Sequence, residues 1–270
     1  ATVTTAYNRD LLEFKHKPDK FQEEAFVSIE NGNNVVVTAH TGSGKTLVCE
    51  FASVCSFLKN NNKIVVYTSP IKTLSNNKFN EFSEKFEKYG KKHNINVKVG
   101  LLTGDNKINP DGNFLIMTTE ILCNSLYKLK QRKEREDETN IIDKIGLLII
   151  DEVHFINDPY RGKVYEQVLV MIDKSVQLVL LSATIDQPER FVKWIEKIKE
   201  RKVDLVTTKR RPVPLNYYVF YPNSTGLDKL WHIMDNDNSF NSKNCDDVNK
   251  QHDKDEATHY RKKPDIHLLN

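Results

Sequence analysis

The stretch LLIIDEVHFINDPYRG, residues 147–162, places two carboxylates and an imidazole directly after four apolar residues. Asp151 and Glu152 are adjacent, and His154 follows two positions later. Such a pair of acids is typical either of an acidic surface turn or of a strand that presents carboxylates to a metal ion and a water molecule. The rest of the chain decides between these two interpretations.

A second motif, AHTGSGKT, follows the apolar run NVVVT and matches the phosphate-loop pattern G-x-x-x-x-G-K-[ST], with Ala39 in place of the first glycine. Small residues in such a loop let main-chain N–H groups close around a phosphate, and the N-terminus of the following helix adds its dipole. We therefore expect nucleotide binding by the loop residues Ala39, His40, Thr41, Gly42, Ser43, Gly44, Lys45 and Thr46.

The phosphate loop gives the two acids a function. In phosphate-loop ATPases a second strand ends in an aspartate that holds Mg2+ beside the loop threonine. We predict Thr46 and Asp151 as magnesium ligands and Lys45 as the cation that reaches the outer phosphates. Glu152 is placed to orient the attacking water and to take its proton. The predicted cofactors are ATP and Mg2+, and the predicted catalytic residues are Lys45, Asp151 and Glu152.

These motifs need elements that hold them together. Short β-rich runs are predicted as strands at 35–38, 64–68, 97–101, 114–117, 147–150, 176–181 and 203–206. Amphipathic segments between many of them predict helices at 46–58, 73–89, 119–129, 163–171 and 188–199. Because the strand runs are mostly apolar rather than alternating, we expect an α/β phosphate-loop domain whose mostly parallel sheet is covered by helices on both faces.

Composition narrows the class of protein. The chain has 270 residues, 39% of them hydrophobic and 29% charged, with a net charge of +3 and a mean hydropathy of −0.55. This fits a soluble globular protein, and the charge only weakly favours a polyanionic partner. No apolar run approaches the roughly 18 residues of a membrane span, so no membrane contact is predicted. The N-terminus lacks a signal pattern, and we expect an intracellular protein, cytoplasmic rather than nuclear.

The ordered set of motifs resembles a known group. AHTGSGKT, DEVH and SAT (182–184) are similar to motifs I, II and III of superfamily-two helicases with a DExH box. The stretches TSPIKTLSNNKFNEF, INPDGNFLIMTTEIL, FINDPYRG and RRPVPLNYYVF narrow the resemblance to superkiller-type, exosome-assisting RNA helicases. The resemblance covers about 21–221. It implies a first RecA-like lobe and ATP hydrolysis coupled to 3′-to-5′ RNA unwinding.

The resemblance also implies roles for single residues. Gln22 is similar to the glutamine that reads adenine, and Phe14 is a weaker candidate for stacking on the base. His154, Ser182, Ala183 and Thr184 resemble the relay between nucleotide and nucleic acid, although Ser182 and Thr184 also suit a helix cap. Nucleic-acid contacts are implied for Pro70, Ile71, Lys72, Thr103, Gly104, Asp105, Thr118, Thr119, Glu120 and Arg161. Arg161 suits a structural brace equally well, and 118–120 suits a helix start.

We divide the chain into a lead-in (1–20), a first RecA-like ATP-binding domain (21–209) and a linker toward a missing second lobe (210–270). The linker is rich in Asn, Asp, Lys and Ser, so we expect it to be partly irregular or disordered, with Trp231 and Met234 anchoring a short helix. No Q-x-x-G-R-x-G-R-like run follows, which favours a fragment over a naturally short protein. Because an arginine finger contributes roughly 10³–10⁵ in rate, we expect little activity from this lobe alone.

The expected partners are single-stranded or 3′-tailed RNA and, by resemblance only, an exosome-like RNA-decay complex. Two alternatives stay open, namely a related DNA helicase and a nucleotide-gated RNA-binding scaffold that does not translocate. TSPIKTLSNNKF and MTTEIL look more like the RNA branch. The intact set of Lys45, Asp151 and Glu152 argues against an enzyme that has lost its activity.

Overall fold

The protein consists of two compact units, Ala1–Lys209 and Arg210–Asn270. The computed structural model describes residues 7–14, 16–59, 62–133, 141–208, 216–220, 230–235 and 239–261. The first unit carries every predicted site residue, and the second is described separately below.

The first unit is built on one eight-stranded sheet with the order β4-β3-β5-β2-β6-β7-β1-β8. All neighbouring strands are parallel except the antiparallel pair of β3 and β4. The strands are β1 (Asn34–Ala39), β2 (Ile64–Ser69), β3 (Val99–Leu102), β4 (Lys107–Ile108), β5 (Phe114–Thr118), β6 (Ile145–Ile150), β7 (Gln177–Ser182) and β8 (Val203–Thr208). The predicted mostly parallel sheet is confirmed, and only the two-residue edge strand β4 was not predicted.

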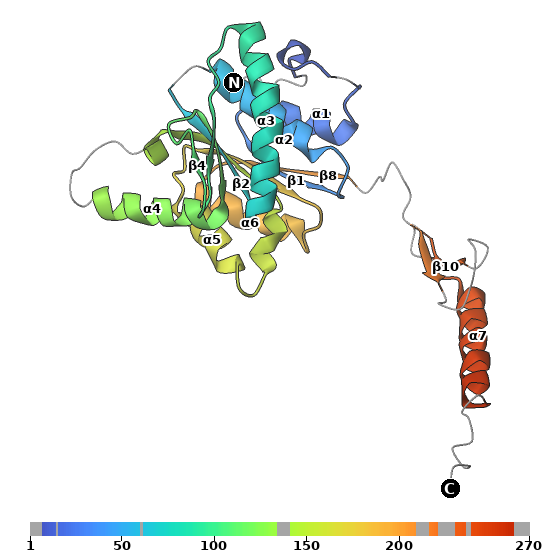
Figure 1. Cartoon of the computed structure of the whole chain (residues 1–270). Coiled ribbons are helices and arrows are strands. Elements are labelled where there is room, and N and C mark those ends of the chain that lie inside the picture. Colours follow the sequence, from blue (N-terminus) through green and yellow to red (C-terminus); the bar gives the residue numbers. More distant parts are fainter. Residues whose placement is uncertain are drawn as a thin grey trace. The chain divides into compact units, whose positions relative to one another are not determined.

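Helices cover both faces of this sheet (Figure 1). One layer contains α1 (Lys20–Glu30), α2 (Lys45–Leu58) and α3 (Lys72–His93), and the other contains α4 (Thr119–Lys133), α5 (Gly162–Met171) and α6 (Pro188–Lys199). Short 3₁₀ turns lie at Arg9–Leu11, Ile141–Lys144 and Val153–Asn157. Alternate strand residues supply two apolar clusters: Val35 and Val37 pack on the α1–α3 side, and Val36 packs on the α4–α6 side.

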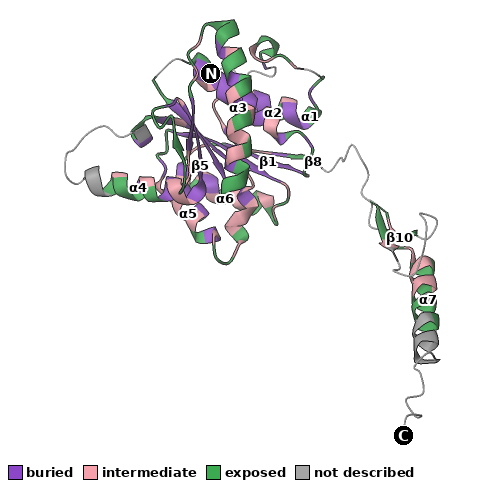
Figure 2. Ribbon diagram, viewed as in Figure 1, coloured by how far each residue is buried: buried purple, intermediate pink, exposed green. Residues whose placement is uncertain are grey.

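Burial on both faces explains the apolar composition of the strands (Figure 2). In β1, β2, β5 and β7 every residue is buried. Parallel strands end at the same edge of a sheet, so the residues that follow β1, β2, β5, β6 and β7 are brought together there. The phosphate loop, the two acids and the SAT triplet all follow these strands or end them.

The second unit is the segment that we expected to be a partly irregular or disordered linker. Its described residues form an antiparallel hairpin of β9 (Tyr217–Phe220) and β10 (Leu230–Met234), followed by α7 (Ser242–Arg261). Trp231 and Met234 lie in β10, so the predicted short helix around them is wrong.

Candidate nucleotide and nucleic-acid site

The phosphate loop joins β1 to α2 and depends on glycine at two positions. Gly42 and Gly44 have φ angles of +81° and +87°, in the left-handed region that L side chains rarely adopt. A Cβ on Gly44 would lie 2.7 Å from Nε2 of Gln22, whereas a Cβ on Gly42 would meet nothing within 4 Å. The loop is therefore built closely against α1 at Gly44.

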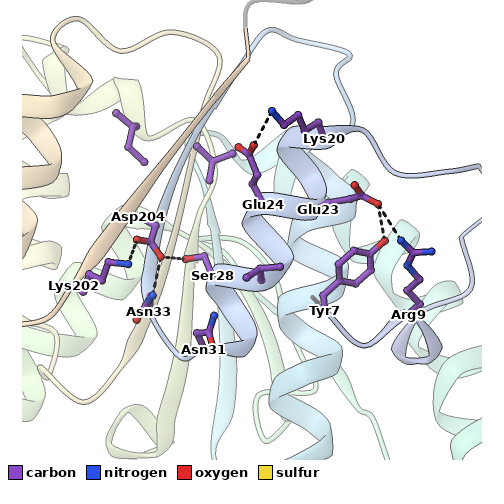
Figure 3. Close-up of a pocket in the computed structure, with 13 residues that line it drawn as sticks. Tyr7, Arg9, Lys20, Glu23, Glu24, Ser28, Asn31, Asn33, Lys202 and Asp204 are labelled. Carbon is purple, nitrogen blue, oxygen red and sulfur yellow. Dashed lines mark hydrogen bonds and ion pairs between the residues drawn. The ribbon is translucent and has the colours of Figure 1, made fainter. Parts of the chain in front are cut away.

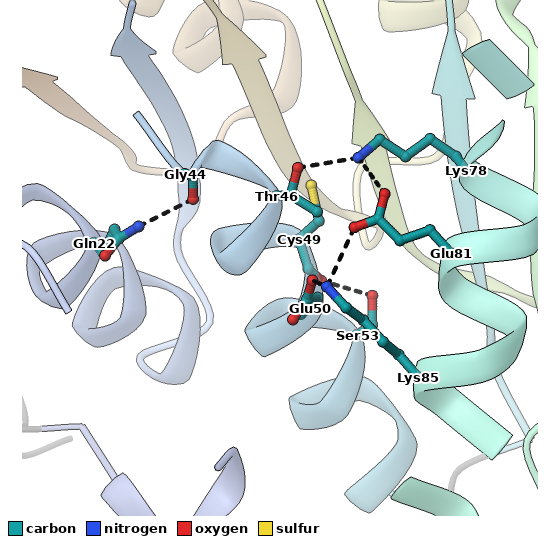
Figure 4. Close-up of polar contacts among 9 residues, drawn as sticks. All are labelled: Gln22, Gly44, Thr46, Cys49, Glu50, Ser53, Lys78, Glu81 and Lys85. Carbon is teal, nitrogen blue, oxygen red and sulfur yellow. Dashed lines mark hydrogen bonds and ion pairs between the residues drawn. The ribbon is translucent and has the colours of Figure 1, made fainter. Parts of the chain in front are cut away.

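Gln22 connects the start of α1 to this loop. Its Nε2 donates a hydrogen bond to the Gly44 carbonyl over 3.0 Å (Figure 4). Its Oε1 accepts one from the main-chain N–H of Asp19 over 2.8 Å. The residue is buried. The predicted adenine-reading glutamine thus lies beside the phosphate loop, and its amide keeps a second N–H and a second oxygen lone pair for a base.

Lys45 lies inside the loop. Its Nζ donates to the carbonyls of Ala39 and His40, over 2.6 and 3.2 Å. Burial lowers the pKa of Lys45, while the nearby carboxylates of Glu152 and Asp151 act in the opposite direction. The ammonium group is therefore held among main-chain carbonyls at the N-terminus of α2, and helix N-termini of this kind bind phosphate oxygens in other proteins.

Asp151 follows β6, and both of its carboxylate oxygens accept hydrogen bonds. The Tyr67 hydroxyl on β2 donates to Oδ2, and the main-chain N–H of Glu152 donates to Oδ1 over 3.0 Å. Burial, followed by the charge of Asp151, raises the pKa of Tyr67 well above its usual value, which keeps the phenol protonated as a donor. The main-chain N–H of Asp151 also bonds to the Thr68 carbonyl of β2. The carboxylate is thus fixed in orientation.

Glu152 has a left-handed backbone, with φ 53° and ψ 45°, and precedes the 3₁₀ turn Val153–Asn157. For a residue other than glycine this conformation costs about 1–2 kcal/mol. Strain of this kind is concentrated at functional sites. It directs the glutamate side chain toward His154, whose Nδ1 lies 3.3 Å from Glu152 Oε2.

The predicted relay residues are brought together. Nδ1 of His154 lies 3.3 Å from the Ser182 hydroxyl at the end of β7, and that hydroxyl lies 3.0 Å from the Thr184 carbonyl, to which it donates. Ala183 lies between them in the chain. A continuous set of polar contacts therefore runs from Glu152 through His154 to the SAT triplet.

The donor set at Thr46 and Asp151 fits magnesium. A hydroxyl and a carboxylate are hard oxygen ligands, and Mg2+ in nucleotide sites is held by one or two such groups together with phosphate oxygens. Within the described residues there is no group of three or more His, Cys, Asp or Glu side chains that could hold a metal ion without a nucleotide. The Thr46 hydroxyl accepts a hydrogen bond from Lys78 Nζ on α3 over 3.1 Å.

The predicted nucleic-acid residues fall into two groups. In the first, Lys72 at the start of α3 forms a 2.6 Å ion pair with Asp105, and a Cβ on Gly104 would lie 3.2 Å from Lys72 Nζ. Ile71 is exposed and Pro70 is buried. Thr103 Oγ1 accepts from the main-chain N–H of Asn106 over 3.0 Å. The contact between Lys72 and Asp105 therefore brings together two segments that lie about 30 residues apart in the sequence. Charged and hydroxyl side chains of this kind hold phosphates without reading bases.

In the second group, Arg161 pairs with Glu120. The Arg161 Nη2 and Nε atoms lie 2.7 and 3.1 Å from one oxygen of Glu120. Thr118 and Thr119, which end β5 and begin α4, are both buried. Their hydroxyl groups are therefore less accessible to phosphate than the sequence led us to expect. This ion pair joins the segment after Asp151 to the start of α4.

Tyr67 and Lys78 were not predicted as site residues. Tyr67 lies inside an apolar strand run, and Lys78 lies on a long helix with many lysines, so neither stood out from its neighbours. Phe14 stacks on Phe26 with the ring centroids 5.7 Å apart, and it belongs to the core around α1 rather than to the nucleotide site.

A cavity of about 570 Å³ lies between α1 and the edge strand β8 (Figure 3). Its charged side chains are paired with one another: Arg9 with Glu23, Lys20 with Glu24, and Lys202 with Asp204. It shares no residue with the phosphate loop. We therefore do not assign the nucleotide to this cavity.

Comparison with known proteins decides the family. The model of the DEAD/DEAH box helicase family matches residues 19–191, which contain the phosphate loop, the two acids and the SAT triplet. The chain belongs to this family. The helicase lobe is 42% identical over 202 residues to the antiviral helicase SKI2 of Saccharomyces cerevisiae and 38% identical over 233 residues to the Superkiller complex protein 2 of Homo sapiens.

These matches cover 75% and 86% of the lobe's chain but only 14% and 17% of the relatives' length. The DExH-box ATP-dependent RNA helicase DExH11 of Arabidopsis thaliana is 39% identical, with 84% of this chain and 15% of the relative covered. A solved structure of the Mycobacterium smegmatis helicase Lhr, bound to single-stranded DNA and AMP-PNP, matches with a TM-score of 0.58 and 25% identity over 71% of this chain and 26% of that one. The resemblance to superkiller-type DExH helicases and the RecA-like fold are confirmed.

None of the helices that the structure describes is both long enough and apolar enough to cross a bilayer.

Proposed function

We propose that this helicase lobe binds ATP with Mg2+ and couples ATP hydrolysis to 3′-to-5′ movement along RNA within the complete protein. One observation carries the proposal. The phosphate loop after β1 and the acids after β6 flank β7, whose Ser182 contacts His154. The residues proposed to bind the nucleotide therefore lie next to His154 and Ser182, which are proposed to relay the state of the site to the nucleic acid.

The chain's own residues have separable tasks. Lys45 and the main-chain N–H groups at the start of α2 hold the phosphates, and Gln22 lies where an adenine edge would reach it. Glu152 accepts the proton of the attacking water, since its carboxylate projects from a turn next to Asp151. Thr46 and Asp151 would hold Mg2+, which supplies the charge that neutralises the phosphate oxygens when it is bound.

We favour RNA as the nucleic acid because relatives 38% and 39% identical to this chain carry the names Superkiller complex protein 2 and DExH-box ATP-dependent RNA helicase DExH11. The DNA-bound structure of Lhr keeps a DNA-acting enzyme as the alternative. The two differ in dependence on the 2′-hydroxyl, so competition between RNA and DNA strands of the same sequence for the complete protein separates them. An exosome-like RNA-decay partner and a cytoplasmic location rest on the same relatives and stay proposals.

The test of the function is RNA-stimulated ATP hydrolysis by the complete protein, with Glu152→Gln and, as a matched control, the exposed Glu166→Gln on α5. We expect Glu152→Gln to bind ATP and to lose hydrolysis, and Glu166→Gln to behave like the wild type. Unchanged turnover in Glu152→Gln would remove Glu152 as the base. Binding of ATP and RNA without any turnover in the wild type would favour the scaffold.

For the 270-residue chain by itself we expect weak nucleotide binding and slow hydrolysis, because the rate contribution of an arginine finger is roughly 10³–10⁵. A single-turnover ATPase assay with and without RNA measures this. Brisk RNA-stimulated turnover by the purified chain would contradict the expectation.

A further inference from the structure

Both proposed magnesium ligands are contacted by side chains of a single strand–helix unit. Tyr67 of β2 donates its hydroxyl to Asp151, and Lys78 of α3 donates to the hydroxyl of Thr46 over 3.1 Å. Strand β2 and helix α3 are consecutive in the chain, joined by the turn that contains Pro70 and Ile71. The pair of metal ligands is thus held from one side by one continuous segment.

Hydrogen bonds connect the turn between β2 and α3 to both of these elements. The Ser69 and Ser75 hydroxyls lie 2.7 Å apart and are both buried. Each hydroxyl also lies within hydrogen-bond distance of the Ile71 carbonyl, at 3.2 and 3.3 Å, and this carbonyl accepts a hydrogen bond from the main-chain N–H of Ser75. Because each hydroxyl carries a single proton, two of these three side-chain contacts are hydrogen bonds at any one time. Because buried hydrogen bonds of this kind are costly to break, the turn, the strand and the start of the helix move together.

The outer end of this unit is the proposed RNA contact. Lys72 and Ile71 are exposed at the start of α3, and Lys78 follows one and two-thirds helical turns later, about 9 Å along the axis. If RNA displaces the start of α3, we therefore expect the side chains of Lys78 and Tyr67 to shift with it. This connection is separate from the one through His154 and Ser182.

We propose that Tyr67 and Lys78 are positioning residues for the magnesium ligands, and that the β2–α3 unit links RNA binding to the metal site. The proposal rests on the function given above. Tyr67 fixes the orientation of the Asp151 carboxylate. Lys78 places a cation beside Thr46 and so competes with Mg2+ for its hydroxyl. Glu81 on α3 offers Lys78 a second partner at 2.8 Å, which allows the ammonium to withdraw from Thr46 (Figure 4).

The two residues act in opposite directions, which provides the test. Orienting residues behind metal ligands typically change metal affinity 10- to 100-fold. Tyr67→Phe should therefore weaken the gain in nucleotide affinity that Mg2+ gives, by about tenfold. Lys78→Met removes a positive charge next to the metal position and should increase that gain, roughly three- to tenfold after screening.

The gain is measured as the ratio of the dissociation constants of a fluorescent N-methylanthraniloyl-ADP without and with Mg2+, on the 270-residue chain. Two matched variants serve as controls. Lys85→Met removes another α3 lysine that shares Glu81 but contacts Glu50 instead of Thr46. Tyr89→Phe removes a buried hydroxyl group, on a partly buried side chain, that has no hydrogen-bond partner among the described residues. Both controls should keep the wild-type ratio.

Opposite shifts for Tyr67→Phe and Lys78→Met, with unchanged controls, support the positioning roles. Shifts in the same direction, or none, overturn them, because a merely structural loss affects both variants alike. The nucleotide affinity without Mg2+ reports on the proposed function independently, through its dependence on Lys45. A wild-type chain that binds nucleotide but gains nothing from Mg2+ would overturn the metal assignment and this inference together.

The link to RNA needs a second arm, in which single-stranded RNA is added to the same titrations. We expect RNA to change the Mg2+ gain of the wild type and of the controls, and to leave it unchanged in the double variant Tyr67→Phe/Lys78→Met. A full RNA effect in the double variant would overturn the link through β2–α3. So would the absence of any RNA effect on the wild-type gain.

Discussion

Gly44 offers a sharp test of how the phosphate loop is built against α1. Replacing it with alanine places a Cβ 2.7 Å from Gln22 Nε2, at a backbone φ of +87°. Gly42→Ala is the matched control, because its φ is +81° but its Cβ meets nothing within 4 Å. Both variants carry the same backbone strain, and only Gly44→Ala disturbs Gln22.

The magnitudes follow from these two contributions. A left-handed alanine costs about 1–2 kcal/mol, partly offset by about 0.4–1 kcal/mol through the smaller conformational entropy of the unfolded chain. Displacing Gln22 removes its bonds to the Gly44 carbonyl and the Asp19 N–H, each worth about 1 kcal/mol net. Gly44→Ala should therefore be about 1–2 kcal/mol less stable than Gly42→Ala, a difference of a few degrees in melting temperature at about 2–4 °C per kcal/mol.

Urea denaturation of the 270-residue chain measures the difference in unfolding free energy. Repeating both substitutions in a Gln22→Ala background isolates the contact. There the Gly44 substitution should cost no more than the Gly42 substitution, since the side chain that it displaces is already gone. Equal costs for the two glycines in the wild-type background, or an undiminished difference without Gln22, would refute the reasoning.

Two further predictions concern groups outside the phosphate loop. Burial lowers the pKa of Lys199, which donates to the Ile172 carbonyl, from 10.5 to about 8. The unfolded chain then holds the proton of this lysine between these values when the folded chain has lost it, so Lys199 itself should contribute a rise in the unfolding free energy from about pH 8 to about pH 10. Lys199→Met should abolish this rise and the exposed Lys197→Met should keep it; equal slopes would count against a buried cation. For the Arg161–Glu120 pair, a double-mutant cycle in urea should give a coupling of about 1 kcal/mol at most, as for other half-exposed ion pairs. If Arg161→Ala weakens RNA binding equally with and without Glu120, Arg161 contacts RNA and is not a brace.

The sheet was predictable because each long strand is an apolar run in the sequence. Segments with helical periodicity lie between many of these runs. The strand ends shifted by at most two residues, for example at β6, which begins at Ile145 rather than Leu147. Lys45, Asp151 and Ser182 were expected to lie near one another because the C-terminal ends of parallel strands lie on the same side of a sheet. The two-residue β4 is too short to show a pattern of its own. Helix α1 was overlooked although it has a capping box at Asp19 and Gln22 and buries Phe21, Ala25 and Ile29 on one face.

The contacts between side chains far apart in the sequence could not be predicted from the sequence. Nothing in the local pattern shows that Arg161 would pair with Glu120, 41 positions away, or that Tyr67 would reach Asp151, 84 positions away. These contacts depend on the order of strands in the sheet, where β6 lies next to β2 although it follows it much later in the chain. The burial of Thr118 and Thr119 has the same cause, since helix α5 covers the start of α4 on that face.

The left-handed Glu152 shows a different limit. Glutamate has no preference for this conformation, and a sequence argument assigns it only a carboxylate near a phosphate. The tertiary structure imposes the strain, because β6 ends at Ile150 and the 3₁₀ turn begins at Val153, so the chain turns within two residues. The presence of carboxylates at this end of the sheet was therefore predictable, and the backbone geometry of Glu152 was not.

The central claim is that Lys45 in this loop holds the phosphates of an adenine nucleotide. Equilibrium binding of N-methylanthraniloyl-ADP with Mg2+ tests it most directly, on the wild-type chain, on Lys45→Met and on Lys59→Met, an exposed lysine at the other end of α2. A hydrogen bond to a charged group is worth about 1.5–3 kcal/mol, so Lys45→Met should bind about 10- to 100-fold more weakly. Lys59→Met should bind like the wild type. Equal affinities for all three proteins would contradict the nucleotide site.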